Sequence, residues 1–312
     1  MCTAMSFKTK DFYFGRNLDL EYCYKEAVTV MPRNFSVALG KEEVKNHYAI
    51  IGMAYIQDGY PLFYDGVNEK GLAIAGLNFP CYCKYRPFEE GKKNVASFEF
   101  IPWILCRCKS TEEAEKEIEN MNITDEAFDE KLQVSPLHWI ISDREKSITV
   151  ECTEDGLKVY QNDVGVLTNS PTFDYHRTNL NNYFHISQTR GENRFSDDIS
   201  FLPYSKGMGA LGIPGDYSSA SRFVKATFLK TNSVCGESEE ESVNQFFHIL
   251  DNVSFVRGCV NDGEGYEITQ YTSVMNADKG KYYYTTYNSR QIKCHSMYDE
   301  DLNASSLSVY PI

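Results

Sequence analysis

The sequence predicts an α+β fold in which antiparallel sheets pack on each other and helices cover them from outside. Three observations lead to this prediction. Short strand patterns dominate the first hundred residues, the middle of the chain and its C-terminal part. Helical patterns lie between these groups of strands, and no internal repeat or low-complexity linker divides the chain. The 312 residues are therefore expected to form one continuous domain with a sizeable core.

Strands are predicted where short runs rich in β-branched and aromatic residues end at Gly, Asn or Asp. The first two runs flank a tight turn, and the four between 137 and 171 have the spacing of an antiparallel meander. The predicted strands are 3–9, 11–17, 48–56, 71–79, 137–143, 147–153, 156–162, 165–171, 271–277, 281–287 and 291–296.

Helices are predicted from capping patterns and from helical spacing of apolar residues. Ser110 and Glu113 form a capping-box pattern ahead of the second predicted helix. The polar, Gly/Pro-rich stretch 186–216 is predicted to be a long loop that precedes the last two helices. The four predicted helices are 98–108, 111–121, about 218–231, and one defined by Val243, Phe246, Phe247, Leu250 and Val253.

The composition excludes several classes of partner. The formal net charge of -13 repels a nucleic-acid backbone, and no Lys/Arg cluster overrides it. No stretch approaches the roughly 20 apolar residues of a membrane helix, and no secretory signal begins the chain. We therefore expect a cytoplasmic protein with no membrane or nucleic-acid partner. The 22 Tyr and 19 Phe can line a broad apolar pocket, although most are expected to fill the core.

The ten cysteines do not predict a disulfide framework or a metal site. In a cytosolic chain of this length, reduced thiols are the better interpretation. The two C-x-C pairs, Cys81/Cys83 and Cys106/Cys108, are spaced more closely than zinc ligands, and the six His residues do not complete a zinc pattern. We expect buried or half-buried thiols and no metal. A thiol- or metal-binding module remains a remote alternative.

One motif points to a cofactor, but its context does not support it. The segment "GMGALG" at 207–212 matches the G-x-G-x-x-G fingerprint of dinucleotide-binding oxidoreductases. That fingerprint must follow a buried strand and open a helix, whereas Pro214 and Gly215 follow here at once. A loop is therefore predicted. The G-x-S-x-G and H-E-x-x-H signatures are absent from the sequence.

Cys2 directly follows the initiator methionine, and this position has a specific chemical use. Methionine aminopeptidase removes Met1 when the next residue is small. Cys2 would then carry a free α-amino group, which titrates near neutral pH, beside its own thiol. One residue would supply both nucleophile and base. An incidental small residue is the alternative, and Cys2 alone does not decide between them.

The predicted first hairpin brings two charged residues towards Cys2. A two-residue turn would pair Cys2 with Asp19, or with Asn17 if the turn begins one residue earlier. Either register places Arg16 and Asp19 within reach of the N-terminus. Arg16 can stabilise a thiolate, and Asp19 can hold the α-amine by a charge-assisted hydrogen bond. An ordinary surface Arg–Asp pair is the alternative.

Several long segments carry a resemblance to a known family. They are "MCTAMSF" with "FGRNLDLEY", "YPLFYDGVNEKGLAIAGLNFP" at 60–80, "LHWIISD" at 137–143, "GVLTNSPTFDYH" at 165–176, "GIPGDYSSASRF" at 212–223, and "YYYTTYNSRQI" at 282–292. Together they resemble the choloylglycine hydrolase family of N-terminal nucleophile hydrolases, which contains bile salt hydrolases and penicillin V acylases. The resemblance covers nearly the whole chain and implies a four-layer αββα sandwich with Cys2 at the start of an inner strand.

The resemblance assigns catalytic roles to residues of this chain. Cys2 would attack an amide carbonyl through its thiol, with its amine as base and later as acid. Arg16 and Asp19 would support it. A thioester would form and be hydrolysed by water, so no metal or organic cofactor is implied.

The resemblance also implies an oxyanion site. Asn169 would donate from its side chain and Asn78 from its backbone N–H, while Arg222 would add positive charge beside the site. Taken singly, the two asparagines would be interpreted as turn residues and Arg222 as a solvated helix residue.

The substrate class follows from the resemblance as well. Asn at position 78 is typical of bile salt hydrolases, whereas penicillin V acylases tend to carry Tyr there, so glycine- or taurine-conjugated bile salts are the expected substrates. Arg222 is a candidate cation for their anionic tail. Candidate residues for the wide apolar slot that a steroid needs are Leu18, Phe128, Leu132 and Val134.

Some expectations concern selectivity and assembly. The "SKG" stretch at 205–207 resembles a Ser-Arg-X loop of taurine-preferring members, in which Lys206 would keep the charge without the fork geometry of arginine. Members are often homotetramers, so the loop near 186–216 is expected to help a tetramer assemble. Penicillin V acylase or N-acyl homoserine lactone acylase activity would use the same machinery and remains an alternative.

Overall fold

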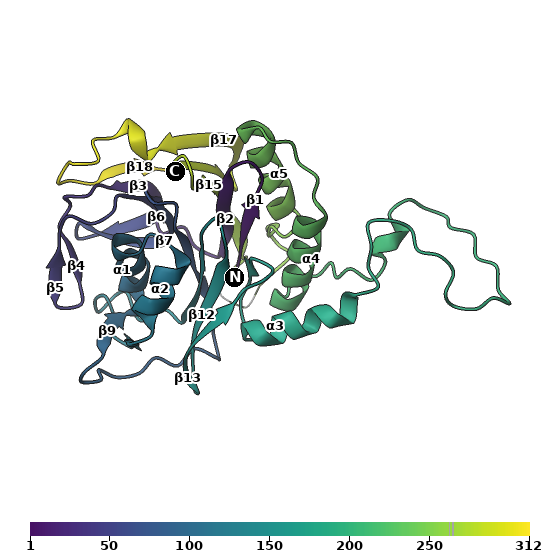
Figure 1. Cartoon of the computed structure of the whole chain (residues 1–312), viewed down its shortest axis with the longest axis horizontal. Coiled ribbons are helices and arrows are strands. Elements are labelled where there is room, and N and C mark those ends of the chain that lie inside the picture. The colour runs from purple at the N-terminus through teal and green to yellow at the C-terminus, as the bar shows by residue number, and fades with distance from the viewer. Residues whose placement is uncertain (262, 264) are drawn as a thin grey trace.

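Two large antiparallel sheets lie face to face, with helices on both outer faces (Figure 1). This computed structural model describes residues 1–261, 263 and 265–312. The layer order helix–sheet–sheet–helix confirms the predicted α+β sandwich. Within the described ranges, no helix is long and apolar enough to cross a membrane.

The first sheet has six strands. Its first strand is buried along its whole length except at Lys8, because one face packs on the second sheet and the other on helices. In spatial order its strands are β14 (Val166–Leu167), β1 (Cys2–Lys8), β2 (Phe12–Leu20), β15 (Ile268–Asn276), β16 (Lys281–Thr286) and β17 (Ser289–Ser296).

The second sheet has eight strands and faces the first one. Its central strands are apolar on both faces, as expected for strands between a sheet and a helix layer. In spatial order they are β13 (Gly156–Gln161), β12 (Ser147–Thr153), β11 (Leu137–Ser142), β8 (Ala73–Asn78), β7 (Tyr60–Asn68), β6 (Ile50–Gln57), β3 (Ala27–Met31) and β18 (Ser308–Pro311). Two small ribbons accompany it, β4 (Val37–Leu39) with β5 (Glu42–Val44), and β9 (Lys93–Ala96) with β10 (Met121–Thr124).

The helices form the two outer layers. α1 packs on β7 and β8 of the second sheet, while α4 and α5 pack on the first sheet. The α-helices are α1 (Phe100–Arg107), α2 (Thr111–Ile118), α3 (Phe173–Asn179), α4 (Ser219–Asn232) and α5 (Glu239–Asp251). Short 3-10 turns lie at Ser97–Glu99, Leu180–Tyr183, Met208–Ala210 and Met297–Asp299.

The first hairpin forms, but both predicted registers are wrong. Lys8 pairs with Phe12 and Cys2 pairs with Leu18. The loop therefore holds three residues, closed by a hydrogen bond from the Thr9 N–H to the Asp11 carbonyl (3.0 Å). A shift of one residue exchanges the two faces of a strand. It thus decides which side chains share a face with Cys2.

The predicted four-strand meander is right for three strands and wrong for the fourth. β11, β12 and β13 are consecutive neighbours, but β14 leaves the second sheet and pairs with β1 of the first, with Ala4 opposite Leu167. The chain turns away at Gly165, whose φ of 59° lies in the left-handed region that favours glycine. The crossing brings the segment after β14, residues 168–172, beside the start of β1.

The helix predictions are confirmed with adjusted bounds. Ser110 caps α2 by accepting from the Glu113 N–H (3.3 Å), while the Glu113 carboxylate accepts from the Lys109 N–H (2.9 Å) and does not complete the reciprocal box. α5 begins four residues before Val243. The long loop near 186–216 is confirmed and projects from the body of the molecule (Figure 1). The "GMGALG" motif lies in it and forms only the 3-10 turn Met208–Ala210.

Candidate active site

The observed register places Cys2 and Arg16 on the same face of the first sheet. Cys2 lies opposite Leu18, and Ala4 lies opposite Arg16, so these side chains all face the second sheet. The Arg16 Nη2 donates to the Cys2 Sγ at 2.6 Å. Cys2 is 2% exposed and Arg16 is fully buried. A buried guanidinium thus lies in direct contact with the sulfur.

Arg16 reaches across a gap in the second sheet. β7 and β8 pair only up to Asp65 and Ala75. Beyond this point the Arg16 Nη1 donates to the carbonyls of Tyr64 in β7 (3.1 Å) and Gly76 in β8 (2.6 Å). The guanidinium thus satisfies carbonyls that the split strands leave without a ladder partner, and these contacts fix its position against the Cys2 sulfur.

A buried carboxylate lies behind Arg16. Asp65 accepts hydrogen bonds from the hydroxyls of Tyr271 (2.6 Å) and Tyr282 (2.7 Å), both on the first sheet. Burial raises the pKa of Asp65, while Arg16 and the two tyrosine hydrogen bonds oppose that rise. Burial alone would lower the pKa of Arg16, but Cys2, Tyr271 and Asp65 raise it above its ordinary value. Arg16 is therefore a permanent cation.

The Asp19 side chain lies on the face of the first sheet opposite to the face that carries the Cys2 side chain. Its Oδ1 accepts from the Thr269 hydroxyl at 2.5 Å. Its Oδ2 is buried and has no hydrogen-bond partner among the residues that the structure describes. Burial raises the pKa of Asp19, and the nearby N-terminus and Arg222 act against this rise. One carboxylate oxygen thus remains available beside the start of the chain.

The chain terminus lies against Asp19, with Met1 in place. The Met1 ammonium donates to the Asp19 backbone carbonyl (2.6 Å) and forms an ion pair with Glu267. Asp19 in turn donates its N–H to the Met1 carbonyl (2.9 Å). Sequence reasoning missed Glu267, because no local pattern links position 267 to the N-terminus. With Met1 in place, the Cys2 nitrogen is an amide that donates to Asn169 Oδ1 (2.8 Å).

Asn169 and Arg222 converge on Cys2 from the segment after β14 and from α4. The Arg222 guanidinium donates to the Cys2 carbonyl (2.5 Å), to Thr3 Oγ1 (2.7 Å) and to Asn169 Oδ1 (2.7 Å). It is 1% exposed, and burial lowers its pKa despite the nearby Asp19. Arg222 therefore holds the Cys2 backbone and orients the Asn169 amide. It is not the solvated helix residue of the alternative interpretation.

The backbone N–H of Asn78 faces the gap beside Cys2, and the side-chain amide of Asn169 contacts Asn78. The Phe79 N–H donates to the Pro136 carbonyl (2.7 Å), so alternation along β8 directs the Asn78 N–H away from β11 and towards the gap. Asn169 Nδ2 donates one of its two protons to the Asn78 carbonyl (2.7 Å). The predicted pair of asparagines is therefore brought together on one side of the thiol.

A cavity of about 400 Å³ opens above the thiol and the gap between the strands. Leu18, Phe128, Leu132 and Val134 all line it. Phe98 and Phe128 pack edge to face at one wall, with ring centroids 5.2 Å apart. Sequence reasoning missed much of the lining, because strands and loops distant in sequence supply it: Leu20, Tyr24, Tyr55, Leu62, Phe63, Tyr64, Phe98, Lys131 and Leu137.

Two predicted recognition residues do not line this cavity. Arg222 lies buried behind Cys2, with its guanidinium occupied by the contacts just described, so the expectation that it contacts an anionic tail directly is wrong for this structure. Lys206 is exposed on the projecting loop and also lies outside the lining. Lys131 and Arg16 are the cations of the lining.

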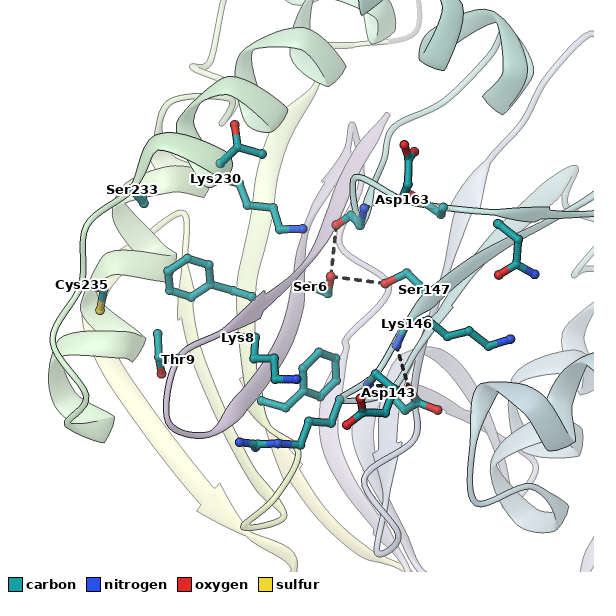
Figure 2. A pocket seen from close by; sticks show the side chains of 18 of the residues that line it. Ser6, Lys8, Thr9, Asp143, Lys146, Ser147, Asp163, Lys230, Ser233 and Cys235 are labelled. Carbon is teal, nitrogen blue, oxygen red and sulfur yellow. Dashed lines mark hydrogen bonds between the residues drawn. The ribbon is translucent and has the colours of Figure 1, made fainter. Parts of the chain in front are cut away.

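A second cavity, of about 700 Å³, lies elsewhere and excludes Cys2 (Figure 2). Acidic and basic side chains occur in it in equal number, namely Asp143, Glu145, Asp163 and Glu237 with Lys8, Arg144, Lys146 and Lys230. Lys230 points into it and donates to the Val164 carbonyl at 2.5 Å, and burial lowers its pKa to about 8. The mixed charge gives this cavity no clear ligand class.

The remaining cysteines do not form a site. All ten are free thiols, and no cluster of three or more His, Cys, Asp or Glu within the described ranges could hold a metal. Cys106 and Cys108 are buried as predicted, and burial raises the pKa of each thiol to about 12. Cys83 is half-buried, but Cys81 is exposed, which the prediction of buried or half-buried thiols did not include.

The αββα architecture, with a thiol on an inner strand next to the chain terminus, is that of the N-terminal nucleophile hydrolases. The chain belongs to the choloylglycine hydrolase family of linear amide C–N hydrolases, whose model matches residues 2–310. The resemblance seen in the sequence is thereby confirmed.

Individual relatives span the whole chain. A bile salt hydrolase/transferase from Lactiplantibacillus plantarum is 47% identical over 315 residues, covering 100% of this chain and 97% of that protein. The crystal structure of the mutant C2A conjugated bile acid hydrolase from Clostridium perfringens matches with a TM-score of 0.93 and 41% identity, covering 100% and 97% of the two chains. A penicillin V acylase from Agrobacterium tumefaciens (TM-score 0.75, 21% identity, coverage 99% and 90%) shares the fold.

Proposed function

We propose that this protein is a bile salt hydrolase that cleaves the amide bond of glycine- or taurine-conjugated bile acids through a thioester on Cys2. The observation that carries the proposal is the contact between the Cys2 sulfur and Arg16 (2.6 Å) at the base of a broad, largely apolar cavity. A volume of about 400 Å³ lies in the range of small-molecule sites. The relatives from L. plantarum and C. perfringens are named for activity on bile salts and conjugated bile acids, which supports the same substrate class.

The proposed reaction requires removal of Met1. The Cys2 nitrogen then becomes an α-amine, beside Asn169 Oδ1 at 2.8 Å. The thiol proton passes to this amine, and the sulfur forms a bond to the amide carbon. The amine then protonates the departing nitrogen as the C–N bond breaks. Water cleaves the resulting thioester, which releases the bile acid and restores the thiol.

The negative charge of the tetrahedral intermediate needs donors at the gap between β7 and β8. The Asn78 N–H and the second Nδ2 proton of Asn169 are the proposed pair. One such donor is commonly worth about 3–4 kcal/mol in the transition state. Arg222 supports them by holding Asn169 Oδ1, which turns the amide so that Nδ2 faces the gap. Asp19 is proposed to orient the α-amine.

Release of glycine from glycocholate and of taurine from taurocholate tests the proposed function, with penicillin V as competing substrate. We expect the wild-type protein to cleave at least one conjugate with higher kcat/KM than penicillin V. Cys2→Ser should nearly abolish turnover, because a serine hydroxyl is a far weaker nucleophile near neutral pH. Preference for penicillin V, or full activity of Cys2→Ser, would contradict the proposal.

The preference between glycine and taurine conjugates is proposed to depend on Lys206. This residue does not line the cavity of its own chain, so it can act only if the projecting loop moves or reaches another copy. The ratio of taurocholate to glycocholate turnover in Lys206→Ala tests the idea, with Lys131→Ala as the matched lysine inside the lining. A ratio unchanged by Lys206→Ala would rule the idea out.

Three further points remain proposals. The whole chain forms one domain, the loop near 186–216 assembles a homotetramer, and the protein is cytoplasmic. The exposed apolar residues of the loop support the second point.

A further inference from the structure

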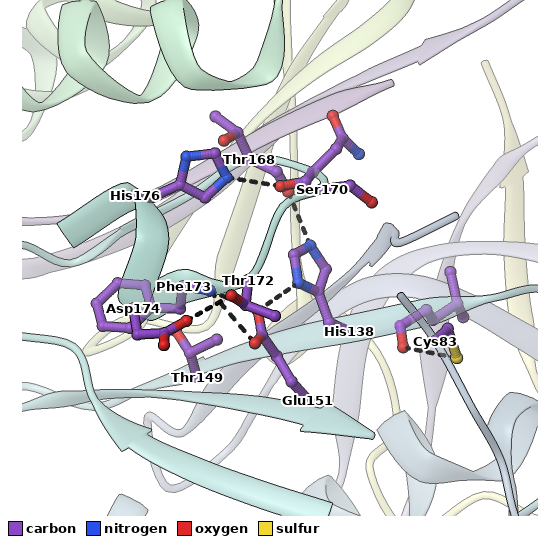
Figure 3. Close-up of polar contacts among 12 residues, drawn as sticks. Cys83, His138, Thr149, Glu151, Thr168, Ser170, Thr172, Phe173, Asp174 and His176 are labelled. Carbon is purple, nitrogen blue, oxygen red and sulfur yellow. Dashed lines mark hydrogen bonds and ion pairs between the residues drawn. The ribbon is translucent and has the colours of Figure 1, made fainter. Parts of the chain in front are cut away.

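The segment that carries Asn169 lies outside both sheets. Its backbone N–H and C=O groups therefore need hydrogen-bond partners from side chains. Two histidines contact consecutive carbonyls: His138 Nε2 lies 2.9 Å from the Thr168 oxygen, and His176 Nε2 lies 2.7 Å from the Asn169 oxygen (Figure 3). The Asn169 N–H donates to Ser219 Oγ (2.8 Å). Every main-chain polar group of Asn169 is thus held by a side chain from another element.

His138 extends this support to the far end of the segment. Its Nδ1 lies 3.0 Å from Glu151 Oε1, and the same carboxylate oxygen accepts the Phe173 N–H at 3.0 Å. His138 and Glu151 are both fully buried. The pair therefore contacts the segment at Thr168, just before Asn169, and again at Phe173, where α3 begins.

Both ring nitrogens of His138 face oxygen acceptors. The fully buried ring therefore links the Glu151 carboxyl group to the Thr168 carbonyl. Its contacts with the segment therefore favour a role in geometry.

His138 also contacts the residue that follows Asn78, which is the other proposed oxyanion donor. The Phe79 ring stacks on the His138 ring, with centroids 4.3 Å apart and an interplanar angle of 9°. Phe79 directly follows Asn78, whose carbonyl accepts from Asn169 Nδ2. One imidazole thus packs against the residue after Asn78 and bonds the residue before Asn169.

We propose that the buried His138–Glu151 pair is a positioning unit that fixes Asn78 and Asn169 relative to each other beside Cys2. The inference rests on the proposed function, because it assigns those asparagines to the oxyanion. The pair touches neither substrate nor sulfur and does not line the cavity. Its loss should impair the transition state and leave ground-state binding in the cavity largely intact.

Steady-state kinetics of Glu151→Gln and His138→Gln on a conjugated bile salt test this proposal. We expect kcat to fall by about 10- to 100-fold, because a displaced oxyanion donor costs up to about 100-fold and a lost one more. KM should change by less than about threefold, since the binding cavity is untouched. Glu151→Gln keeps the size of the side chain, so it decides the question if His138→Gln does not fold.

His47→Gln is the matched control. His47 is also buried, and its ring nitrogens lie 2.8 Å and 2.9 Å from the carbonyls of Tyr48 and Phe35, outside the cavity and the Asn169 segment. It should lower the melting temperature yet leave kcat within about twofold. Unchanged kcat in Glu151→Gln, a parallel rise of KM, or an equal loss of kcat in His47→Gln would overturn the proposal.

Hydrogen exchange of the amides of residues 168–170, 172 and 173 separates this inference from the proposed function. Faster exchange in Glu151→Gln than in wild type is expected, with no change in His47→Gln. If the wild-type protein cleaves no conjugate, the proposed function fails, and the exchange still decides whether the pair holds the segment. Exchange equal to that of wild type would contradict the positioning role.

Discussion

Arg16 is the residue on which the geometry around Cys2 depends. Its planar guanidinium contacts two carbonyls on separated strands and the sulfur at the same time. These contacts combine a structural task, which is to close the gap between β7 and β8, with a chemical one, which is to place a cation at the Cys2 sulfur. A point charge on a flexible stem cannot do both.

Arg16→Lys should therefore lower kcat/KM for a conjugated bile salt by about 100-fold, the size of effect seen when an electrostatic donor is lost from such a site. Alkylation of Cys2 by iodoacetamide should slow in parallel, because the guanidinium no longer contacts the sulfur. Arg144→Lys is the control, since Arg144 is exposed and pairs with Asp278 at the surface. Activity of Arg16→Lys equal to that of Arg144→Lys would contradict the role of the planar Arg16 guanidinium.

His176 should make stability depend on pH. Burial lowers its pKa from 6.5 to about 4, and the nearby His138 and Arg222 act in the same direction. Below pH 6.5 His176 binds a proton in the unfolded chain but stays neutral in the folded chain. The free energy of unfolding therefore falls as the pH drops towards 4. The loss is about 3 kcal/mol at most.

His176→Gln should remove this part of the pH dependence. Urea unfolding of both proteins between pH 7 and pH 4 measures it, and the difference between the two curves isolates His176 from the carboxylates. Parallel curves over that range would show that His176 does not titrate as its burial implies.

At the scale of elements, the start of α4 places Arg222 and Ser219 at the site. Ser218 caps the helix by accepting from the Ser221 N–H, and Asp216 accepts from the Ser218 N–H (2.9 Å) and the Ser221 hydroxyl (2.6 Å). Those hydrogen bonds lower the pKa of Asp216 to about 2. The cap thus sets where the helix begins, and with it where Arg222 lies.

Ser218→Ala should cost about 1 kcal/mol of unfolding free energy, as for other helix caps, and should also lower kcat because α4 carries Arg222. Ser238→Ala is the matched control. Ser238 caps α5 in the same way, but α5 supplies no residue of the site, so this variant should lose stability without losing kcat. We would measure kcat and urea unfolding of both variants. Equal kcat values would refute the link between the α4 cap and the position of Arg222.

Sequence patterns predicted the strands and helices better than the register and the sheet in which each strand pairs. Alternation and length gave the hairpin at 3–17, but Thr9, Lys10 and Asp11 are polar residues that fit two- or three-residue turns equally well. The register, and so the face shared by Cys2 and Arg16, was therefore open. Similarly, 165–171 reads as a meander strand locally. Only the tertiary fold sends β14 to the first sheet and carries Asn169 to Cys2.

At the scale of the whole molecule, the projecting loop exposes large apolar side chains. Phe195, Leu202 and Tyr204 are 80%, 90% and 81% exposed. Exposed apolar residues gathered on one projection favour burial against another protein surface. This supports the proposed tetramer, in which the loops would pack on neighbouring copies.

Replacing Phe195 and Leu202 by Ser should reduce the molar mass measured by light scattering after size exclusion. Val234→Ser is the control, because Val234 is 88% exposed but lies outside the loop. A monomeric wild-type protein, or a double variant that keeps the wild-type mass, would contradict the proposed assembly.

The cavity shows where sequence reasoning ends at this scale. Leu18, Phe128, Leu132 and Val134 could be proposed because a steroid needs a wide apolar slot and these are apolar residues. The remaining lining comes from strands and loops brought together only by the packing of two sheets. Arg222 was misplaced for the same reason: its charge predicts contact with an anion, whereas its burial behind Cys2 directs it to the backbone and to Asn169.

Mass spectrometry of the protein quenched during turnover of a conjugated bile salt tests the central claim most directly. The account predicts that the N-terminal peptide begins at Cys2 and carries the bile acyl group as a thioester. A peptide that retains Met1 in a fully active protein, or an acyl group attached elsewhere in the chain, would contradict it.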